Sequence, residues 1–187
     1  MNARVSAIDR LRSLPALFRG SDLTVRFQWS SKTTSQYVYL WRQRGLVQPL
    51  GGHSDVFANL LVAPQPDWDR AVRMAMPSSL LVGIEVLRRA GWTTQIPQRP
   101  DIVVQAGQRT YQVEPFRVST RPAAWFNRMR HGIDCTTALP ALRPAWALAD
   151  MLVNEGWGAC GLWPDDVDFD QDDDDLQSAL EASRMTP

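Results

Sequence analysis

The 187-residue chain has little of the chemistry on which most metal proteins and hydrolases depend. It contains two histidines, His53 and His131, and two cysteines, Cys135 and Cys160, and neither pair has a motif spacing. Two scattered histidines are too few for a histidine-based metal site or an evident catalytic triad. Two lone cysteines indicate neither a zinc site nor a disulfide framework. We therefore expect that the protein binds no metal ion or cofactor and that it is not an enzyme.

Long apolar runs are also absent. No stretch approaches the roughly 20 apolar residues that a membrane-spanning helix needs. The arginine-punctuated start, Met1 to Arg12, lacks the apolar core of a secretory signal. With 44% hydrophobic and 21% charged residues, the composition is that of an ordinary globular protein. We expect a cytoplasmic protein with no membrane partner and, at this length, two small cores rather than one large one.

The formal net charge is zero, but the charges are unevenly distributed. The first fifty residues carry eight arginines and lysines against two aspartates, whereas Asp165 to Asp175 places eight acids in eleven positions. A basic N-terminal segment (the basic front, residues 1–50) with an acidic C-terminal tail indicates that the basic front binds an anion such as nucleic acid. A solvated helical face would give the same count, so the charge alone decides nothing.

The front of the chain has the pattern of three helices followed by a hairpin. Apolar spacing predicts a first helix from Ala3 to about Phe18, a second capped by Ser21 or Asp22 and running to Trp29, and a third capped by Ser30 or Ser31. Gly45 ends that third helix near Arg44. Strands are expected at residues 46–47 and 56–62, around a turn at 51–55. This order predicts a winged helix-turn-helix in residues 1–63.

The third helix is the expected DNA reader. If Val38 and Trp41 point inward, the polar residues of its N-terminal half face outward, which is the end that a recognition helix inserts into the major groove. Gln36 can pair bidentately with adenine, and the cations can neutralise phosphates. The expected contacts are Ser31, Lys32, Thr33, Ser35, Gln36, Tyr39, Arg42, Arg44 and, at the wing tip, His53. The alternatives for this segment are a helical hairpin with a polar surface, or a winged helix that contacts another protein. A histidine in a turn such as His53 is more often an exposed turn residue than a DNA contact.

Residues 64–164 have the pattern of a second, mixed α/β domain with a small sheet, so the predicted fold class is α+β. A short helix at 68–76 follows a linker, and a second helix starts at Ser78 or Ser79 and ends at Gly91, with Glu85 on its solvent face. Period-two patterns at 102–104 and 111–118 around a turn at 106–108 predict a hairpin. Two further helices begin at Pro122 and Pro144.

One constellation in this domain has the outline of a nuclease site. Asp101 and, beyond the expected hairpin, Glu114 resemble the paired carboxylates of a PD…ExK nuclease, which hold magnesium. Phe116 stands where that motif needs its lysine. We therefore expect no nuclease activity, although a degenerate nuclease remains the less favoured alternative.

Residues 165–187 form the acidic tail, with a possible helix from Leu176 to Arg184. It lacks the glycine and the spaced terminal glutamate of an EF-hand loop. A solvated, partly disordered segment is the default expectation, and the alternative is that it folds back on the basic front or docks on a basic partner.

From about Ser21 to Val153 the chain resembles the AbiEi family of antitoxins and transcriptional regulators from type IV toxin–antitoxin systems. Three stretches carry the resemblance. They are the segment from Lys32 through Arg44-Gly45-Leu46-Val47, the segment from Ser79-Leu80-Leu81 through Ala90-Gly91 to Gln95-Ile96-Pro97, and the segment from Leu139-Pro140 through Ala147-Leu148-Ala149-Asp150-Met151-Leu152. The second is similar to the family's leucine-rich helix followed by a "QIP" element, and the third to its "LP…ALLD" helix.

The resemblance implies a repressor that binds inverted repeats in the double-stranded DNA of its own operator, and an antitoxin that counters a nucleotidyltransferase-like toxin. In type IV systems the antitoxin need not contact the toxin directly. A free-standing winged-helix regulator without a toxin is the alternative.

Overall fold

The computed structural model describes residues 6–169 and 173–184, which form a mixed α+β fold with eight α-helices and two small sheets. The chain divides after Pro77 into two compact units, which are described separately below. Within the described residues, no helix combines the length and the apolar character needed to cross a membrane.

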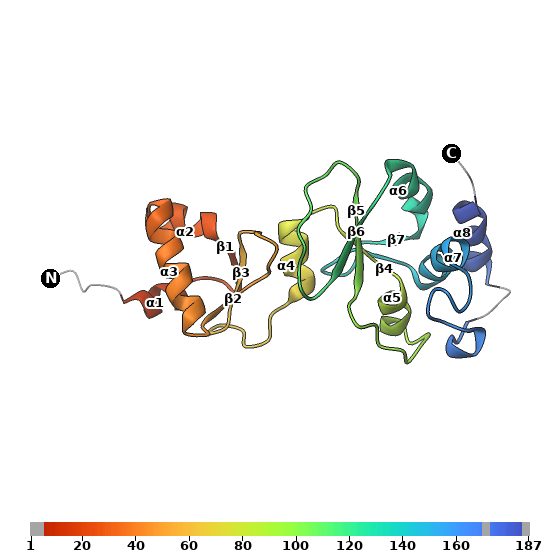
Figure 1. The fold of residues 1–187 in the computed structure, drawn as a ribbon, viewed down its shortest axis with the longest axis horizontal. Coiled ribbons are helices and arrows are strands. Elements are labelled where there is room, and N and C mark those ends of the chain that lie inside the picture. The colour runs from red at the N-terminus through yellow and green to blue at the C-terminus, as the bar shows by residue number, and fades with distance from the viewer. Residues whose placement is uncertain (1–5, 170–172, 185–187) are drawn as a thin grey trace. The chain divides into compact units, whose positions relative to one another are not determined.

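The first unit combines four helices with a three-stranded antiparallel sheet (Figure 1). The sheet has the order β1-β3-β2, so that the last strand lies between the other two. Its elements are α1 (Ala7–Arg12), β1 (Leu17–Arg19), α2 (Gly20–Phe27), α3 (Ser31–Gln43), β2 (Val47–Pro49), β3 (Val56–Asn59) and α4 (Trp68–Ala75).

Local signals set the limits of α3 as expected. The Ser30 hydroxyl accepts a hydrogen bond from the Thr33 N–H at 3.1 Å, which caps the start of the helix. Gly45 has a φ of 65°, a conformation that glycine adopts without strain, and the helix ends at Gln43 just before it.

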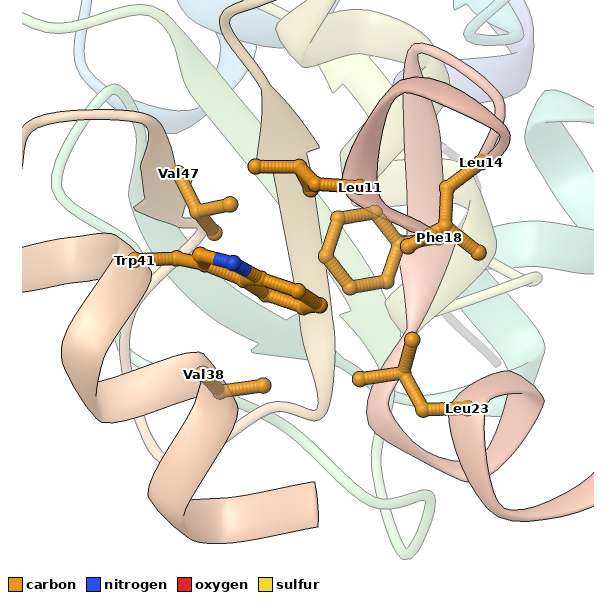
Figure 2. Packing of buried hydrophobic residues seen from close by; sticks show 7 residues of the cluster. All are labelled: Leu11, Leu14, Phe18, Leu23, Val38, Trp41 and Val47. Atoms are coloured by element: carbon orange, nitrogen blue, oxygen red, sulfur yellow. The ribbon is translucent and has the colours of Figure 1, made fainter. Parts of the chain in front are cut away.

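The core of this unit lies between α1, α2, α3 and the sheet. Figure 2 shows the side chains that converge there, and Trp41 and Phe18 are almost completely buried among them. Its members are Leu11, Leu14, Phe18, Leu23, Val38, Trp41 and Val47. Truncating a buried Phe or Trp to Ala typically lowers the free energy of unfolding by about 3–5 kcal/mol. Burial of Trp41 in this cluster therefore determines which face of α3 points inward.

The predicted first helix is wrong in its C-terminal part. α1 ends at Arg12, and Leu17–Arg19 instead form a strand that pairs with β3. Pro15 explains the break, since the residue before a proline is pushed out of the helical region and proline itself has no N–H to donate. The expected start at Ala3 lies outside the described residues.

The expected boundary at residue 63 also differs from the observed one. α4 packs against β3, so it belongs to the first unit. The strand expected to reach residue 62 ends at Asn59, whose buried amide donates to the carbonyl oxygens of Leu11 and Leu14 at 2.8 and 3.3 Å. The side chain of Asn59 therefore ties the end of β3 to the end of α1.

The second unit is built on a five-stranded mixed sheet of order β6-β5-β4-β8-β7. Strands β5 and β6 run parallel, as do β4 and β8, while β4 and β5 and also β7 and β8 are antiparallel. Its elements are β4 (Leu80–Val82), α5 (Ile84–Arg89), β5 (Asp101–Gln105), β6 (Arg117–Arg121), α6 (Ala123–Met129), the 3₁₀ turn η1 (Arg130–Gly132), β7 (Ile133–Asp134), β8 (Ala141–Leu142), α7 (Pro144–Asn154), η2 (Pro164–Asp166) and α8 (Asp174–Arg184).

The predicted helix from Ser78 or Ser79 to Gly91 is two elements. Leu80, Leu81 and Val82 are all buried and form the central strand β4, which Gly83 (φ 73°) separates from the short helix α5. A strand buried on both faces shows no alternation, so a short apolar run of this kind can be mistaken for part of a helix.

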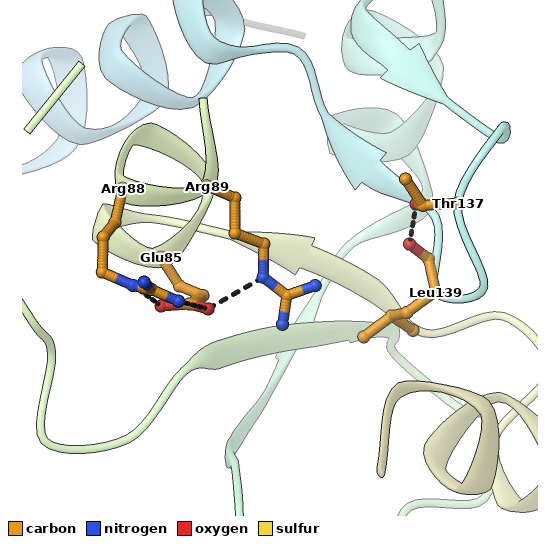
Figure 3. Close-up of polar contacts among 5 residues, drawn as sticks. All are labelled: Glu85, Arg88, Arg89, Thr137 and Leu139. Carbon is orange, nitrogen blue, oxygen red and sulfur yellow. Dashed lines mark hydrogen bonds and ion pairs between the residues drawn. The ribbon is translucent and has the colours of Figure 1, made fainter. Parts of the chain in front are cut away.

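Glu85, expected on the solvent face, is buried at 5% exposure. Its carboxylate accepts hydrogen bonds from Arg88 Nε and Nη2 at 2.7 Å and from Arg89 Nε at 2.8 Å, as Figure 3 shows. The Arg88 hydrogen bonds lower the pKa of Glu85, burial opposes this, and the Arg89 hydrogen bond and the charges of both arginines lower it further. Figure 3 also shows the turn that precedes β8. There Thr137 Oγ1 donates a hydrogen bond to the Leu139 carbonyl and stabilises the turn.

The predicted hairpin at residues 102–118 is wrong. The turn at 106–108 is present, with Gln108 N–H donating to the Gln105 carbonyl, but the chain then passes back through residues 109–116 and enters β6 parallel to β5. Asp101 therefore pairs in register with Arg117. Pro122 and Pro144 do stand at the starts of α6 and α7, as expected.

The acidic segment is partly an ordered helix of the second unit. α8 packs against α7, where Asp175 accepts a hydrogen bond from Trp146 Nε1 at 2.9 Å and forms an ion pair with Arg143 at 2.8 Å. Asp170 and Asp172 lie outside the described residues. The possible helix at Leu176–Arg184 is thus confirmed, with Leu176 and Ala179 buried, whereas the expectation of a solvated, partly disordered acidic segment is wrong for Asp174 and Asp175, which begin this helix.

Candidate nucleic-acid interface

Helix α3 presents one buried and one exposed face. Thr34, Val38 and Trp41 are buried, at 8%, 8% and 1% exposure. On the opposite face Tyr39 and Leu40 are 60% and 49% exposed. The inward direction of Val38 and Trp41, on which the predicted contact residues depended, is therefore confirmed.

Lys32, Gln36 and Tyr39 share the exposed face, since they follow one another at helical spacing and are all exposed. Gln43 continues this face by a further turn and is also exposed. Gln43 was not among the predicted contacts. Its position seven residues after Gln36, close to two helical turns, would have placed it on the same face.

The three predicted hydroxyl contacts are placed differently. Ser35 Oγ donates to the Ser31 carbonyl at 2.9 Å, so its proton already has an acceptor within the helix. Thr33 is half-buried and its hydroxyl lies 2.9 Å from the Ser30 hydroxyl. Ser31 is exposed at the first position of the helix. Ser31 and Ser35 lie on a flank of the exposed face, and Thr33 on the other.

The cations around α3 have no counter-ion within the part of the chain that the structure describes. Lys32, Arg42 and Arg44 are exposed, and among the residues that the structure describes none of them forms an ion pair. Arg26, at the end of α2, has the same character and was not among the predicted contacts. These side chains are free to interact with an external anion.

His53 lies in the turn between β2 and β3, where it is exposed and has a left-handed backbone with φ of 62°. The Ser54 N–H donates to the Gly51 carbonyl and closes this turn at 3.0 Å. No ring contact or hydrogen bond holds the imidazole within the described chain. The turn therefore projects His53 without fixing its side chain.

An aromatic cluster links α1, α3 and the turn between α2 and α3. The helices are joined by residues 28–30, where Gln28 adopts a left-handed conformation with φ of 53°. Trp29 stacks on Tyr37 with ring centroids 4.2 Å apart, and the Arg10 guanidinium lies 5.3 Å from the Trp29 ring. This cluster was not predicted, because it joins α1, the turn and α3 through contacts distant in sequence.

The structure does not bring the nuclease-like carboxylates together into a paired site. Arg117 holds Asp101 through two hydrogen bonds, the Nη2–Oδ2 one at 2.7 Å, and Glu114 is exposed and pairs with Arg99 at 3.3 Å. Each acid thus has a separate arginine as its partner. Within residues 6–169 and 173–184, no group of three His, Cys, Asp or Glu side chains is arranged to hold a metal ion.

No family model matches the chain, and no curated protein matches it either. Among solved structures, its fold is similar to the crystal structure of the RV2827C protein from Mycobacterium tuberculosis, with a TM-score of 0.60 at 18% sequence identity. The match covers 94% of this chain and 69% of the other. At this identity the likeness concerns the fold alone.

Proposed function

We propose that the chain is a cytoplasmic DNA-binding transcriptional regulator whose first unit is a winged helix-turn-helix. The exposed face of α3, with polar side chains and with neighbouring cations that have no counter-ion among the described residues, is the observation that carries the proposal. Such cations can neutralise phosphates, and an exposed glutamine amide in the N-terminal half of a recognition helix can pair bidentately with adenine.

The topology of the first unit supports this assignment. Helices α2 and α3 are joined by the short turn at residues 28–30, as in a helix-turn-helix. The β2–β3 hairpin follows α3, in the position of a wing, and carries His53 at its turn. In this assignment α3 enters the major groove and the hairpin lies along the backbone.

The antitoxin role and autorepression rest on the resemblance to the AbiEi family. We propose that the chain binds inverted repeats upstream of its own operon, and that the second unit opposes a nucleotidyltransferase-like toxin, with or without contact to it. A free-standing regulator would use the same α3 surface. A nucleotidyltransferase-like gene directly downstream would favour the antitoxin, and an unrelated neighbour would favour the free-standing regulator.

Salt-dependent DNA binding by the full chain tests the proposal. The affinity for labelled duplex from upstream of the gene is measured at several salt concentrations for the wild type, Lys32→Ala, Arg42→Ala and the control Arg99→Ala. Arg99 is an exposed arginine of the second unit. Each lost phosphate contact should flatten the slope of log affinity against log salt by about one unit.

The control should keep the wild-type slope. If Lys32→Ala and Arg42→Ala also keep it, or if the wild type binds no duplex at low salt, α3 is not a DNA-binding surface and the proposal fails.

A further inference from the structure

The second unit has a cleft of about 270 Å³ on the face of the sheet next to α7. The parallel register of β5 and β6 pairs Asp101 with Arg117 and Val103 with Ser119, so these side chains lie on one face of the sheet. Residues of α7 and its C-terminus close the other side. Three separate elements therefore contribute charged or polar groups to one small space.

Two of the acids in the cleft are already satisfied. Asp101 is held by Arg117 through two hydrogen bonds. Asp150 is buried and accepts hydrogen bonds from Trp125 Nε1 at 2.8 Å and from Asn154 Nδ2 at 2.9 Å. These contacts hold both carboxylates in the walls of the cleft, and both hydrogen bonds to Asp150 reach the same oxygen, Oδ1.

Two other charged groups in the cleft have no such partner. Arg121 is half-buried, and its Nε is a fully buried donor with no hydrogen-bond acceptor among the described residues. Glu155, beyond the end of α7, is exposed. The hydrogen bond and charge of Asp101 raise the pKa of Arg117, and the charge of Glu155 helps to raise it, but the Glu155 carboxylate forms no hydrogen bond or ion pair with the described residues. The Arg121 guanidinium also forms no ion pair with any described residue, so the accessible part of this group favours an anionic ligand group.

The charges of the cleft narrow the class of ligand. Its two guanidinium groups face three carboxylates, those of Asp101, Asp150 and Glu155. A simple anion would add to this negative excess, and a simple cation would leave the Arg121 guanidinium without a counter-ion. A molecule that carries both charges satisfies Arg121 and Glu155 together.

We propose that this cleft is a binding site for a small zwitterion of the α-amino-acid type, whose carboxylate binds Arg121 and whose ammonium group binds Glu155. Its volume lies below the roughly 300–1,000 Å³ of pockets for drug-sized ligands, which limits the ligand to a small metabolite. All residues of the site belong to the second unit, whereas the proposed DNA contacts belong to the first.

The test titrates the full chain with each standard L-amino acid at millimolar concentration, without DNA, by calorimetry and by thermal unfolding. Succinate and n-propylamine serve as probes with only one kind of charge. At least one amino acid should bind saturably and raise the Tm. Arg121→Gln and Glu155→Gln should each weaken that binding about tenfold or more, as expected for loss of a charge-assisted hydrogen bond.

Arg109→Gln and Glu181→Gln are matched controls, since both side chains are exposed and lie outside the cleft. Both should bind as the wild type does. Circular dichroism checks that each variant is folded, and Arg121→Lys, which keeps the charge but loses the Nε donor, replaces Arg121→Gln if the latter is unfolded.

The proposal is overturned if no amino acid binds, if the Arg121 variants bind as tightly as the wild type, or if succinate binds equally well and independently of Glu155. Because binding is measured on the protein alone, a failure here leaves the DNA-binding proposal untouched, and a failure to bind DNA leaves this one untouched.

Discussion

Gln36→Ala provides the sharpest test of how α3 meets DNA. Gln36 is exposed in the N-terminal half of α3, on the same face as Lys32 and Tyr39. Its amide can donate to and accept from one adenine edge, whereas a cation can only donate. Alanine is a better helix former than glutamine, and the exposed Gln36 side chain forms no hydrogen bond with the described residues, so the substitution should leave the fold intact.

Loss of a bidentate base contact costs about 1–3 kcal/mol, which corresponds to a loss of affinity of about 5- to 150-fold. We expect this loss on duplex from upstream of the gene and almost none on a scrambled duplex. Fluorescence anisotropy titrations of both duplexes at one fixed salt concentration measure the specificity ratio, which should fall by the same factor.

Gln43→Ala and Gln98→Ala are the matched controls. Gln43 lies on the same face but seven residues later, about 10.5 Å along the helix axis, and Gln98 is an exposed glutamine of the second unit. Both should change the ratio less than Gln36→Ala does. If Gln36→Ala lowers both affinities equally, or neither, α3 is not placed with its N-terminal half in the major groove.

Three other predictions concern antitoxin activity, nuclease activity and stability. A full chain with Lys32→Ala should repress a reporter less but still rescue growth from the downstream toxin; loss of both would refute separate roles for the two units. The pure protein should not cleave duplex or single-stranded DNA with magnesium or manganese, and cleavage abolished by Asp101→Ala would refute this. Glu85→Gln should lower the free energy of unfolding by about 1 kcal/mol at neutral pH, a modest value because Arg88 and Arg89 are more than one third exposed. Since the folded pKa of Glu85 lies below its ordinary 4.5, its contribution is present above pH 4.5 and is lost as the pH falls through the lower folded value. Urea unfolding of both proteins from pH 7 downward should therefore show the difference narrowing below pH 4.5, and a constant difference would contradict the ion-pair origin.

Elements with local signals could be predicted from the sequence. The Ser30 cap and Gly45 set the ends of α3, and Pro144 stands at the start of α7, because these residues act on the backbone within one turn. The exposure of Gln36 followed from the apolar positions Val38 and Trp41 for the same reason. A local rule needs no knowledge of the tertiary structure.

Elements that depend on distant partners could not be predicted. Leu17–Arg19 is a strand only because β3 lies beside it, and Leu80–Val82 only because β5 and β8 flank it. Strands of two or three residues carry too few side chains to show a period. The parallel pairing of β5 with β6 was missed because the turn at residues 106–108 gives the same local signal whether or not the chain then returns along β5.

The distribution of ion pairs links the neutral composition to the proposed DNA surface. Several arginines of the second unit are neutralised by neighbouring carboxylates, so their fields fall off quickly with distance. They are Arg88, Arg89, Arg99, Arg117 and Arg143. Around α3, by contrast, Lys32, Arg42 and Arg44 have no such partner among the described residues. A chain of zero net charge can therefore still present a positive surface to phosphates. Its acidic side chains form ion pairs with arginines of the second unit, whereas the exposed cations around α3 have no acidic partner among the described residues.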